Sequence, residues 1–298
     1  MPTLTIFTPA YNRAHTIGRT YESLCRQTCK DFEWLVVDDG SVDNTKELVE
    51  AWIHENKIQI RYIYQENQGM HGAHNTAYRN ITTELNTCID SDDYMPDDAV
   101  EKILSFWSKN GSDKYAGIIG LDVSMCDGAV IGTDFADLAI TLTTYYDNGG
   151  SGDKKIVYRT AVIQQYPEYP LFKGEKYVSL ATKYFMIDQD WTLLTMNEPL
   201  AVVEYQSDGS SLNMYRQYKL NPQGFVYDRK LVLSNNPRLL KKAKYCCHYI
   251  ANKLLACQFD IISDSPAPLM TFVMLPIGFL WYAFIQYKNV VHAGRYSR

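Results

Sequence analysis

The chain has 298 residues, of which 46% are hydrophobic and 21% are charged, and its formal net charge at pH 7 is −5. This composition is that of an ordinary globular protein, and it excludes a collagen-like, disordered or low-complexity chain. The seven cysteines contain no CxxC pair, and the first residues lack the basic and apolar regions of a secretory signal. We therefore expect reduced thiols in a cytoplasmic protein and no zinc site.

The first hundred residues alternate between apolar runs and helical patterns. Apolar runs typical of strands occur at residues 4–7, 32–37, 58–64 and 87–89. Apolar residues at spacings of three and four, such as Ile17, Tyr21 and Leu24, predict helices between these runs, and the segment 70–83 is also predicted to be helical. The alternation predicts the α/β class, with a mostly parallel sheet flanked by helices.

The middle of the chain continues this pattern less regularly. Residues 117–135 and 156–163 are predicted to form further strands. The Gly-rich stretch 147–153 between them is predicted to be a loop near the substrate. Further on, Asn236-Pro237 is predicted to open a helix with one apolar face.

The charge is distributed unevenly along the chain. Residues 213–298 contain 12 Lys and Arg but 3 Asp and Glu, so they carry +9, whereas the remaining 212 residues carry −14. We therefore expect a catalytic domain over residues 1–212, divided into halves at 1–105 and 106–212, and a basic helical region over 213–298. A basic tail is typical of proteins that bind nucleic acid or an anionic membrane surface.

The segment 267–287 is uncharged and rich in large apolar residues, with Pro276 and Gly278 in its middle. Its length is borderline for crossing a bilayer, so three alternatives stay open: a spanning helix, a kinked segment in the membrane interface, or a helix packed on the body. Residues suited to the interface or to lipid phosphates are Trp281, Tyr282, Tyr287, Lys288 and Arg295. These features favour shallow membrane attachment over nucleic-acid binding.

Three carboxylates fall within the four residues Asp90-Ser91-Asp92-Asp93, directly after a predicted strand. Because like charges repel at this spacing, a divalent cation would stabilise them, and hard oxygen ligands suit Mg²⁺ or Mn²⁺ bridging to a diphosphate. The alternative is an acidic turn that caps the next helix, which Pro96 opens.

Two other polar segments follow predicted strands. In Asp38-Asp39-Gly40-Ser41, a carboxylate can accept a hydrogen bond from a ribose hydroxyl or a base N–H, although a simple Asp-Gly turn is the alternative. The stretch 67–75 contains Gly69 and Gly72, which permit close backbone approach. It can equally be a helix start.

Taken in order, these segments resemble glycosyltransferase family 2, the inverting nucleotide-sugar transferases of GT-A fold. The motifs that carry the resemblance are Thr8-Pro9-Ala10-Tyr11-Asn12-Arg13, Val37-Asp38-Asp39-Gly40-Ser41, Asn67-Gln68-Gly69 with Asn75, and Ile89-Asp90-Ser91-Asp92-Asp93. The resemblance is specific over residues 3–105 and fainter to about 215, where 174–177 and 200–205 look like the family's acceptor half. It implies an enzyme that moves a sugar from a nucleotide donor, with a UDP-sugar expected, to a glycan hydroxyl.

The resemblance also implies roles for individual residues. The implied donor-binding residues are Thr8, Ala10, Tyr11, Arg13, Asp39, Gly69, Asn75, Asp90 and Ser91, and the implied ligands of Mg²⁺ or Mn²⁺ are Asp92 and Asp93. Among these, Asp39 would bond the uracil edge, and Asp90 would contact the ribose or the metal. Which aspartate ligates the metal directly stays open by one or two positions.

A catalytic base is implied in the second half, where family members often carry Glu-Asp. Here Glu175 is followed by Lys176 instead, and we expect Glu175 to be the base, with Asp188 and Asp190 as alternatives. The base would remove a proton from the acceptor hydroxyl as it attacks the anomeric carbon. The metal would offset charge on the departing diphosphate.

Two other classes compete with this interpretation. A sugar nucleotidyltransferase or a dehydrogenase would carry a Gly-rich phosphate loop, but the sequence has neither GxGxxG after its first strand nor GxxxxGK[ST]. A catalytically inactive GT-A-like binding protein is the other alternative. The expected partners are a nucleotide-sugar donor, a glycan or lipid-linked glycan acceptor and the inner face of the cytoplasmic membrane, with no nucleic acid.

Overall fold

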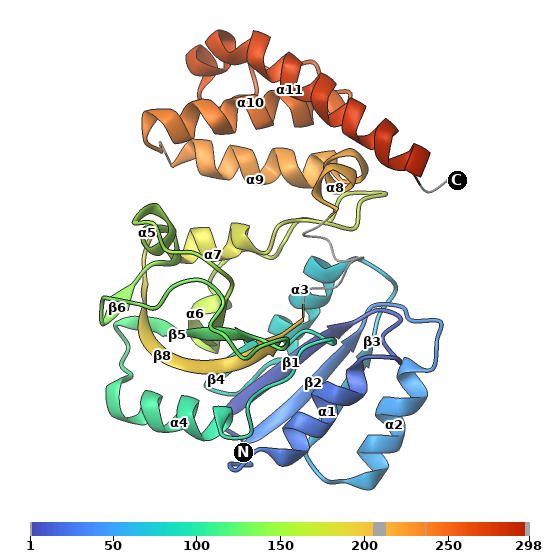
Figure 1. The fold of residues 1–298 in the computed structure, drawn as a ribbon, viewed down its shortest axis with the longest axis vertical. Coiled ribbons are helices and arrows are strands. Elements are labelled where there is room, and N and C mark those ends of the chain that lie inside the picture. Colours follow the sequence, from blue (N-terminus) through green and yellow to red (C-terminus); the bar gives the residue numbers. More distant parts are fainter. Residues whose placement is uncertain (1, 205–212, 236, 296–298) are drawn as a thin grey trace. The chain divides into compact units, whose positions relative to one another are not determined.

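The computed structural model describes residues 2–204, 213–235 and 237–295. The chain divides into two compact units, one of residues 1–168 with 183–205 and one of residues 169–182 with 206–298 (Figure 1). The division therefore differs from a single boundary after residue 212, because segment 169–182 groups with the C-terminal helices. In that segment, the ring of Tyr177 stacks on Phe225 with centroids 5.2 Å apart.

Within the described residues, the first unit contains an eight-stranded sheet in the order β3-β2-β1-β4-β7-β5-β8-β6. The strands are β1 (Leu4–Ala10), β2 (Phe32–Asp38), β3 (Ile60–Tyr64), β4 (Leu85–Cys88), β5 (Tyr115–Ser124), β6 (Ala139–Ile140), β7 (Lys154–Arg159) and β8 (Thr192–Val203). The first four strands are mutually parallel, whereas β7 runs antiparallel between β4 and β5. The carboxyl ends of β1, β2 and β4 consequently lie at one edge, which the amino end of β7 joins.

Helices flank this sheet, as the spacing of apolar residues predicts (Figure 1). They are α1 (Ile17–Arg26), α2 (Thr45–Glu55), α3 (Met70–Asn80), α4 (Ala99–Asn110), α5 (Leu142–Asp147), α6 (Thr160–Ile163) and α7 (Ala181–Ile187). Aromatic packing fixes α1 and α2 to β2, since the rings of Tyr21 and Trp52 stack at 4.3 Å and both lie against Trp34. The predicted mostly parallel α/β architecture is confirmed.

Two predicted strands are shorter in the structure than in the sequence pattern. The run 117–135 is interrupted after β5 by a turn at Gly128, whose φ of 71° suits glycine. The side chain of Asp127 accepts a hydrogen bond from the Ala129 N–H across this turn (3.1 Å). The run 156–163 splits in a similar way, since β7 ends at Arg159 and α6 follows directly.

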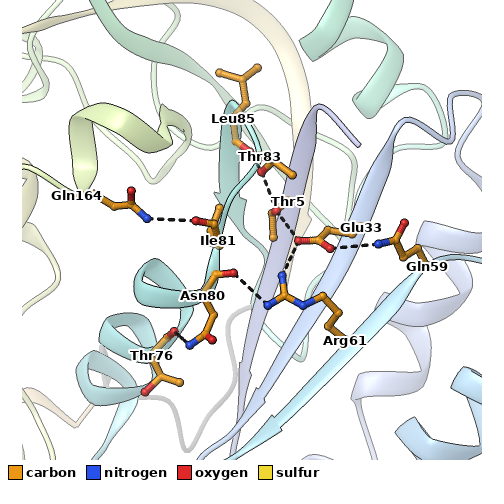
Figure 2. Close-up of polar contacts among 10 residues, drawn as sticks. All are labelled: Thr5, Glu33, Gln59, Arg61, Thr76, Asn80, Ile81, Thr83, Leu85 and Gln164. Atoms are coloured by element: carbon orange, nitrogen blue, oxygen red, sulfur yellow. Dashed lines mark hydrogen bonds and ion pairs between the residues drawn. The ribbon is translucent and has the colours of Figure 1, made fainter. Parts of the chain in front are cut away.

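A polar network joins the strands away from their carboxyl ends (Figure 2). The Glu33 carboxylate accepts hydrogen bonds from Thr5 Oγ1 and Arg61 Nη1, both at 2.9 Å, and the Glu33 side chain is 5% exposed. Arg61 also donates to the Asn80 carbonyl at the end of α3 (3.0 Å). These polar groups therefore join β1, β2 and β3 to α3.

The second unit is helical over its described C-terminal part. Its helices are α8 (Met214–Leu220), α9 (Pro222–Ser234), α10 (Leu239–Leu255) and α11 (Pro268–Arg295). Of the helix opening predicted at Asn236-Pro237, Asn236 lies outside the described residues, and α10 begins at Leu239, two residues after Pro237. Close packing of α11 on α10 depends on Gly278, where an added Cβ would lie 2.6 Å from the Cβ of Ile250. The predicted helical C-terminal extension is thus confirmed.

Candidate active site

The loops that follow β1 and β2 are joined by hydrogen bonds. Asn12 has a φ of 54°, a left-handed conformation that asparagine tolerates better than most residues. Its backbone N–H donates to Ser41 Oγ (2.8 Å), and its side-chain oxygen accepts from the Val42 N–H (2.9 Å). The backbone N–H of Arg13 donates to Thr45 Oγ1 at 3.0 Å. Tyr11 and Arg13 are therefore presented from a fixed loop.

The residues predicted to line a uridine pocket differ in their accessibility. Thr8 is fully buried, and its hydroxyl accepts a hydrogen bond from Trp34 Nε1 (2.9 Å). Ala10 is likewise buried, whereas the Tyr11 side chain is 49% exposed. Thr8 and Ala10 thus support the loop from within the sheet, and Tyr11 is open to a ligand.

Asp39 holds the loop between β3 and α3. Its Oδ1 accepts from the side-chain amide of Gln65 (2.6 Å) and the backbone N–H of Gln68 (2.8 Å). Its Oδ2 accepts from the Gly69 N–H at 2.7 Å, and the Gly69 φ of 84° requires a residue without a side chain. Asn75, in the next turns of α3, is buried. Asp39 therefore fixes the geometry of the predicted nucleotide site.

The three aspartates after β4 lie at the same edge of the sheet. Thr20 Oγ1 donates to the Asp93 carbonyl (2.7 Å), and the Asp93 carboxylate accepts from the backbone N–H of Glu204 (3.2 Å). Ser91 and Asp93 are buried, whereas Asp90 and Asp92 are partly exposed. The parallel strands β2, β1 and β4 thus bring the Asp38-Asp39 turn, the Tyr11 loop and the aspartates to neighbouring positions.

Burial and the neighbouring charge of Asp90 raise the pKa values of two of these carboxyls, those of Asp92 and Asp93. The pKa of Asp93 rises to about 7, first through burial and then through the charge of Asp90. The same two causes raise the pKa of Asp92, which the charges of Arg13 and Arg19 partly offset. Groups held in this way gain from a nearby cation, because a positive charge favours their ionised form.

These residues fit a hard divalent cation held jointly with a ligand. Within the described residues, no group of three or more His, Cys, Asp or Glu side chains converges to hold a metal by itself. Mg²⁺ normally binds through one or two protein carboxylates together with substrate phosphates rather than in an all-protein cage. The carboxylates of Asp92 and Asp93 would be the protein ligands of such a site. Burial and Asp90 disfavour their ionised forms, which a bound cation would stabilise.

The three candidates for the catalytic base make different contacts. Both carboxylate oxygens of Glu175 accept from backbone N–H groups at the start of α9, those of Gln223 and Gly224, each at 2.9 Å. Asp188 accepts from the backbone N–H and the hydroxyl of Thr143 at the start of α5, both at 2.7 Å. Asp190, by contrast, is exposed and accepts from the Tyr166 hydroxyl (2.8 Å). Glu175 lies in the second unit, and Asp188 and Asp190 lie in the first.

Sequence reasoning missed two basic residues around the aspartates. The positive charge of Arg19 partly offsets the rise in the pKa of Asp92. Arg19 also forms an ion pair with Glu204 at 2.7 Å. Lys155, at the amino end of β7, donates from Nζ to the Cys88 carbonyl at the end of β4 (3.1 Å). The available signals were a basic residue on the polar side of α1 and a Lys-Lys pair directly after the Gly-rich loop.

Parts of this sequence match a known family and known proteins. Residues 5–155 match the family described as Glycosyl transferase family 2. A chondroitin synthase of Escherichia coli is 37% identical over 110 residues, which cover 37% of this chain and 16% of that protein. A hyaluronan synthase of Pasteurella multocida is 36% identical over 110 residues, covering 37% of this chain and 11% of the relative. The matched segments are thus a small part of both relatives.

Solved structures share the whole fold at low sequence identity. The structure of S. aureus TarS residues 1–349 in complex with UDP-GlcNAc has a TM-score of 0.60 at 17% identity, covering 98% of this chain and 92% of that one. The mannosyltransferase PcManGT of Pyrobaculum calidifontis, in complex with GDP-Man and Mn²⁺, has a TM-score of 0.54 at 16% identity. The match covers 98% of this chain and 80% of that one. The predicted GT-A fold is confirmed by this likeness. Because the family match covers half of the chain, the protein belongs to glycosyl transferase family 2.

Proposed function

We propose that the chain transfers a sugar, with inversion, from a UDP-sugar to a hydroxyl of a glycan acceptor, and that Mg²⁺ or Mn²⁺ is required. The observation that carries this proposal is the gathering of Asp39, Tyr11 and the aspartates 90–93 at the carboxyl ends of β2, β1 and β4. Ligands of open α/β sheets bind at that edge. The UDP and UDP-GlcNAc held by S. aureus TarS, which has the same fold, support a uridine donor.

In this proposal, residues at the carboxyl ends of β1, β2 and β4 bind different parts of the donor. Tyr11 and the backbone fixed by Asp39 hold the nucleoside, and Asp92 with Asp93 holds the cation. That cation supplies charge compensation for the departing diphosphate. A carboxylate accepts the proton of the acceptor hydroxyl while the new C–O bond forms at the anomeric carbon and the bond to the diphosphate breaks.

UDP with Mn²⁺ should stabilise the protein against heat. At a ligand concentration about 100 times Kd, binding adds about 2.7 kcal/mol, which raises Tm by about 4 °C for a protein of this size. Differential scanning fluorimetry with UDP alone, Mn²⁺ alone and both together measures the effect, and ADP with Mn²⁺ is the matched control.

Assays of UDP-sugar hydrolysis and transfer on the same samples distinguish an active transferase from an inactive relative. Hydrolysis or transfer of a UDP-sugar must accompany binding in a transferase, whereas binding without either reaction would indicate an inactive relative. A Tm unchanged by UDP with Mn²⁺ would contradict the proposed donor.

The base is proposed to be Glu175, with Asp188 and Asp190 as alternatives, and two isosteric variants distinguish Glu175 from the exposed Asp190. Because both oxygens of Glu175 accept backbone N–H donors at the start of α9, Glu175→Gln should lower Tm as well as any activity. Asp190 is exposed, so Asp190→Asn should leave Tm unchanged. If Asp190 is the base, turnover should fall by roughly 100-fold or more at unchanged UDP affinity. Full activity of Asp190→Asn, with turnover lost in Glu175→Gln at a temperature where that variant stays folded and binds UDP as the wild type does, would instead assign the base to Glu175.

The acceptor is proposed to be lipid-linked, with the enzyme attached to the inner face of the cytoplasmic membrane. Within the described residues, segment Pro268–Val291 of α11 is long and apolar enough to cross a membrane, by length and composition. One face of α11 packs on the helical unit through Thr271, Gly278 and Ile285. Its other face exposes large apolar side chains, namely Leu269, Phe272, Val273, Ile277, Leu280, Tyr287 and Val290.

A helix packed on one face and apolar on the other suits attachment in the plane of the membrane. Contiguous exposed apolar surface of this kind marks membrane or protein interaction sites. The charge of +9 on residues 213–298 favours an anionic lipid surface, because apolar insertion and electrostatic attraction add. Such attachment would bring the catalytic unit to acceptors carried on lipid.

A further inference from the structure

Asp122, near the end of β5, has a buried carboxylate with one oxygen that accepts no hydrogen bond from the described residues. Its side chain is 3% exposed, and Oδ1 has no hydrogen-bond partner among the residues that the structure describes. Leaving a buried carboxylate oxygen unsatisfied is costly, and such a group in a native protein commonly has a functional explanation. Burial also raises the pKa of Asp122 to about 6. We take Asp122 as a candidate ligand-binding group.

Lys155 links Asp122 to the aspartates after β4. Its ammonium donates to the Cys88 carbonyl (3.1 Å) and interacts with the charges of Asp122, Asp90 and Asp93. Burial alone would lower the pKa of Lys155, but these carboxylates outweigh it and raise the pKa above its usual value. The Lys155 ammonium is therefore held at the end of β4 by the Cys88 carbonyl and interacts electrostatically with both the proposed metal ligand Asp93 and Asp122.

The backbone around Asp122 is held firmly in place. The Asp122 carbonyl accepts from the Ile131 N–H at 2.8 Å. Lys154 Nζ donates to the carbonyls of Ile131 (2.7 Å) and Ser151 (3.0 Å), which joins the loop after β5 to the Gly-rich loop before β7. Gly152 is required at this junction, since an added Cβ would collide with the Ile131 carbonyl. A rigid setting of this kind suits a group that orients a ligand.

The order of the strands gives the direction in which a bound donor would extend. In the proposed function the nucleoside lies at β1 and β2, and the diphosphate lies at the aspartates after β4. Along the sheet, β7 and then β5 come next, and two strand spacings amount to about 10 Å. The sugar attached to the diphosphate would therefore extend past Lys155 toward Asp122.

This inference rests on the proposed function. We propose that Asp122 Oδ1 and Lys155 Nζ form the subsite for the transferred sugar, one accepting from and the other donating to its hydroxyl groups. We further infer that the sugar is a neutral hexose or N-acetylhexosamine. The carboxylate of a uronic acid would face Asp122 at close range, and like charges in a buried site repel strongly.

Calorimetric titration in the presence of Mn²⁺ tests the subsite without relying on turnover. UDP, UDP-glucose, UDP-N-acetylglucosamine and UDP-glucuronate are titrated into the wild type and into Asp122→Leu, which replaces the two accepting oxygens by methyl groups. At least one neutral UDP-sugar should bind the wild type more tightly than UDP-glucuronate. In Asp122→Leu its Kd should rise about tenfold or more, as expected for loss of a hydrogen bond to a charged group, while the Kd for UDP stays within twofold.

Two further variants guard against misfolding and unrelated effects. Asp122→Asn keeps the shape and a neutral acceptor, so it should fold and show a smaller loss than Asp122→Leu. Asp134→Asn alters an exposed carboxylate in the loop that follows β5 and should bind every ligand as the wild type does.

Several results would overturn the subsite. These are an unchanged Kd for neutral UDP-sugars in both Asp122 variants, tighter binding of UDP-glucuronate than of the neutral donors, or a lowered Tm in both variants with sugar binding intact. The last result would make Asp122 a structural partner of Lys155. Failure of the wild type to bind UDP would overturn the proposed function itself, and the UDP titration reports that separately.

Discussion

Replacement of Asp92 by asparagine should abolish sugar transfer and leave the protein folded. Asparagine keeps the size of the side chain but loses the charge that attracts a divalent cation, so turnover should fall on the order of 100-fold or more. Because burial and Asp90 raise the pKa of Asp92, removing its charge relieves repulsion in the folded state. The Tm of Asp92→Asn should therefore equal or exceed that of the wild type, as scanning calorimetry would show.

A matched control lies five residues further along the chain. Asp97 is exposed and forms a surface ion pair with Arg26 (3.0 Å), an interaction worth about 1 kcal/mol or less. Asp97→Asn should thus keep full activity and a nearly unchanged Tm. Normal turnover by folded Asp92→Asn, or undiminished activity in EDTA, would rule out the proposed metal site.

Polar substitutions on the outer face of α11 should release the protein from membranes. Phe272 and Leu280 are 63% and 70% exposed, so Phe272→Gln with Leu280→Gln should leave the helical unit folded. Insertion of each side chain into lipid contributes about 1.5 to 3 kcal/mol, so the double variant should bind phosphatidylglycerol vesicles at least about 100-fold more weakly than the wild type. Vesicle sedimentation measures this change, and transfer to small soluble acceptors should persist.

The control uses the same chemistry on the catalytic unit. Leu138 is 89% exposed in the loop before β6, and Leu138→Gln should sediment with vesicles as the wild type does. Deleting α11 is a poorer test, because Thr271 and Ile285 are buried in the helical unit and their loss would expose its core. Equal sedimentation of the double variant and the wild type would exclude attachment through this face.

The residues at the carboxyl ends of the first strands could be predicted because each strand and the polar residues after it are adjacent in the sequence. Each of β1, β2 and β4 is a short, mostly buried strand that leads into polar residues, and parallel pairing brings such ends together. The Asp38-Asp39 turn and the aspartates 90–93 could therefore be placed at one site without coordinates. The role of Asp39 in holding the loop before α3 could not be predicted from the sequence. Its oxygens accept hydrogen bonds from the backbone of residues about thirty positions away.

The acceptor half was harder to predict because its strands are irregular. The register between β5 and β8 shifts at several points, and the turn at Gly128 interrupts the run predicted as one strand. Such bulges and turns break the period-two pattern on which strand prediction depends. The whole of β8 was missed for this reason, and the predicted strand 117–135 was too long.

The sequence by itself determined the family resemblance, the α/β class and the acidic groups at the ends of the first strands, since each depends on residues close together in the chain. Tertiary structure alone decided which charges meet. It placed Lys155 beside Asp90 and Asp122, gave Glu175 the backbone donors at the start of α9, and divided α11 into a packed face and an exposed one. These outcomes depend on pairing and packing between distant segments, which local periodicity and composition do not encode.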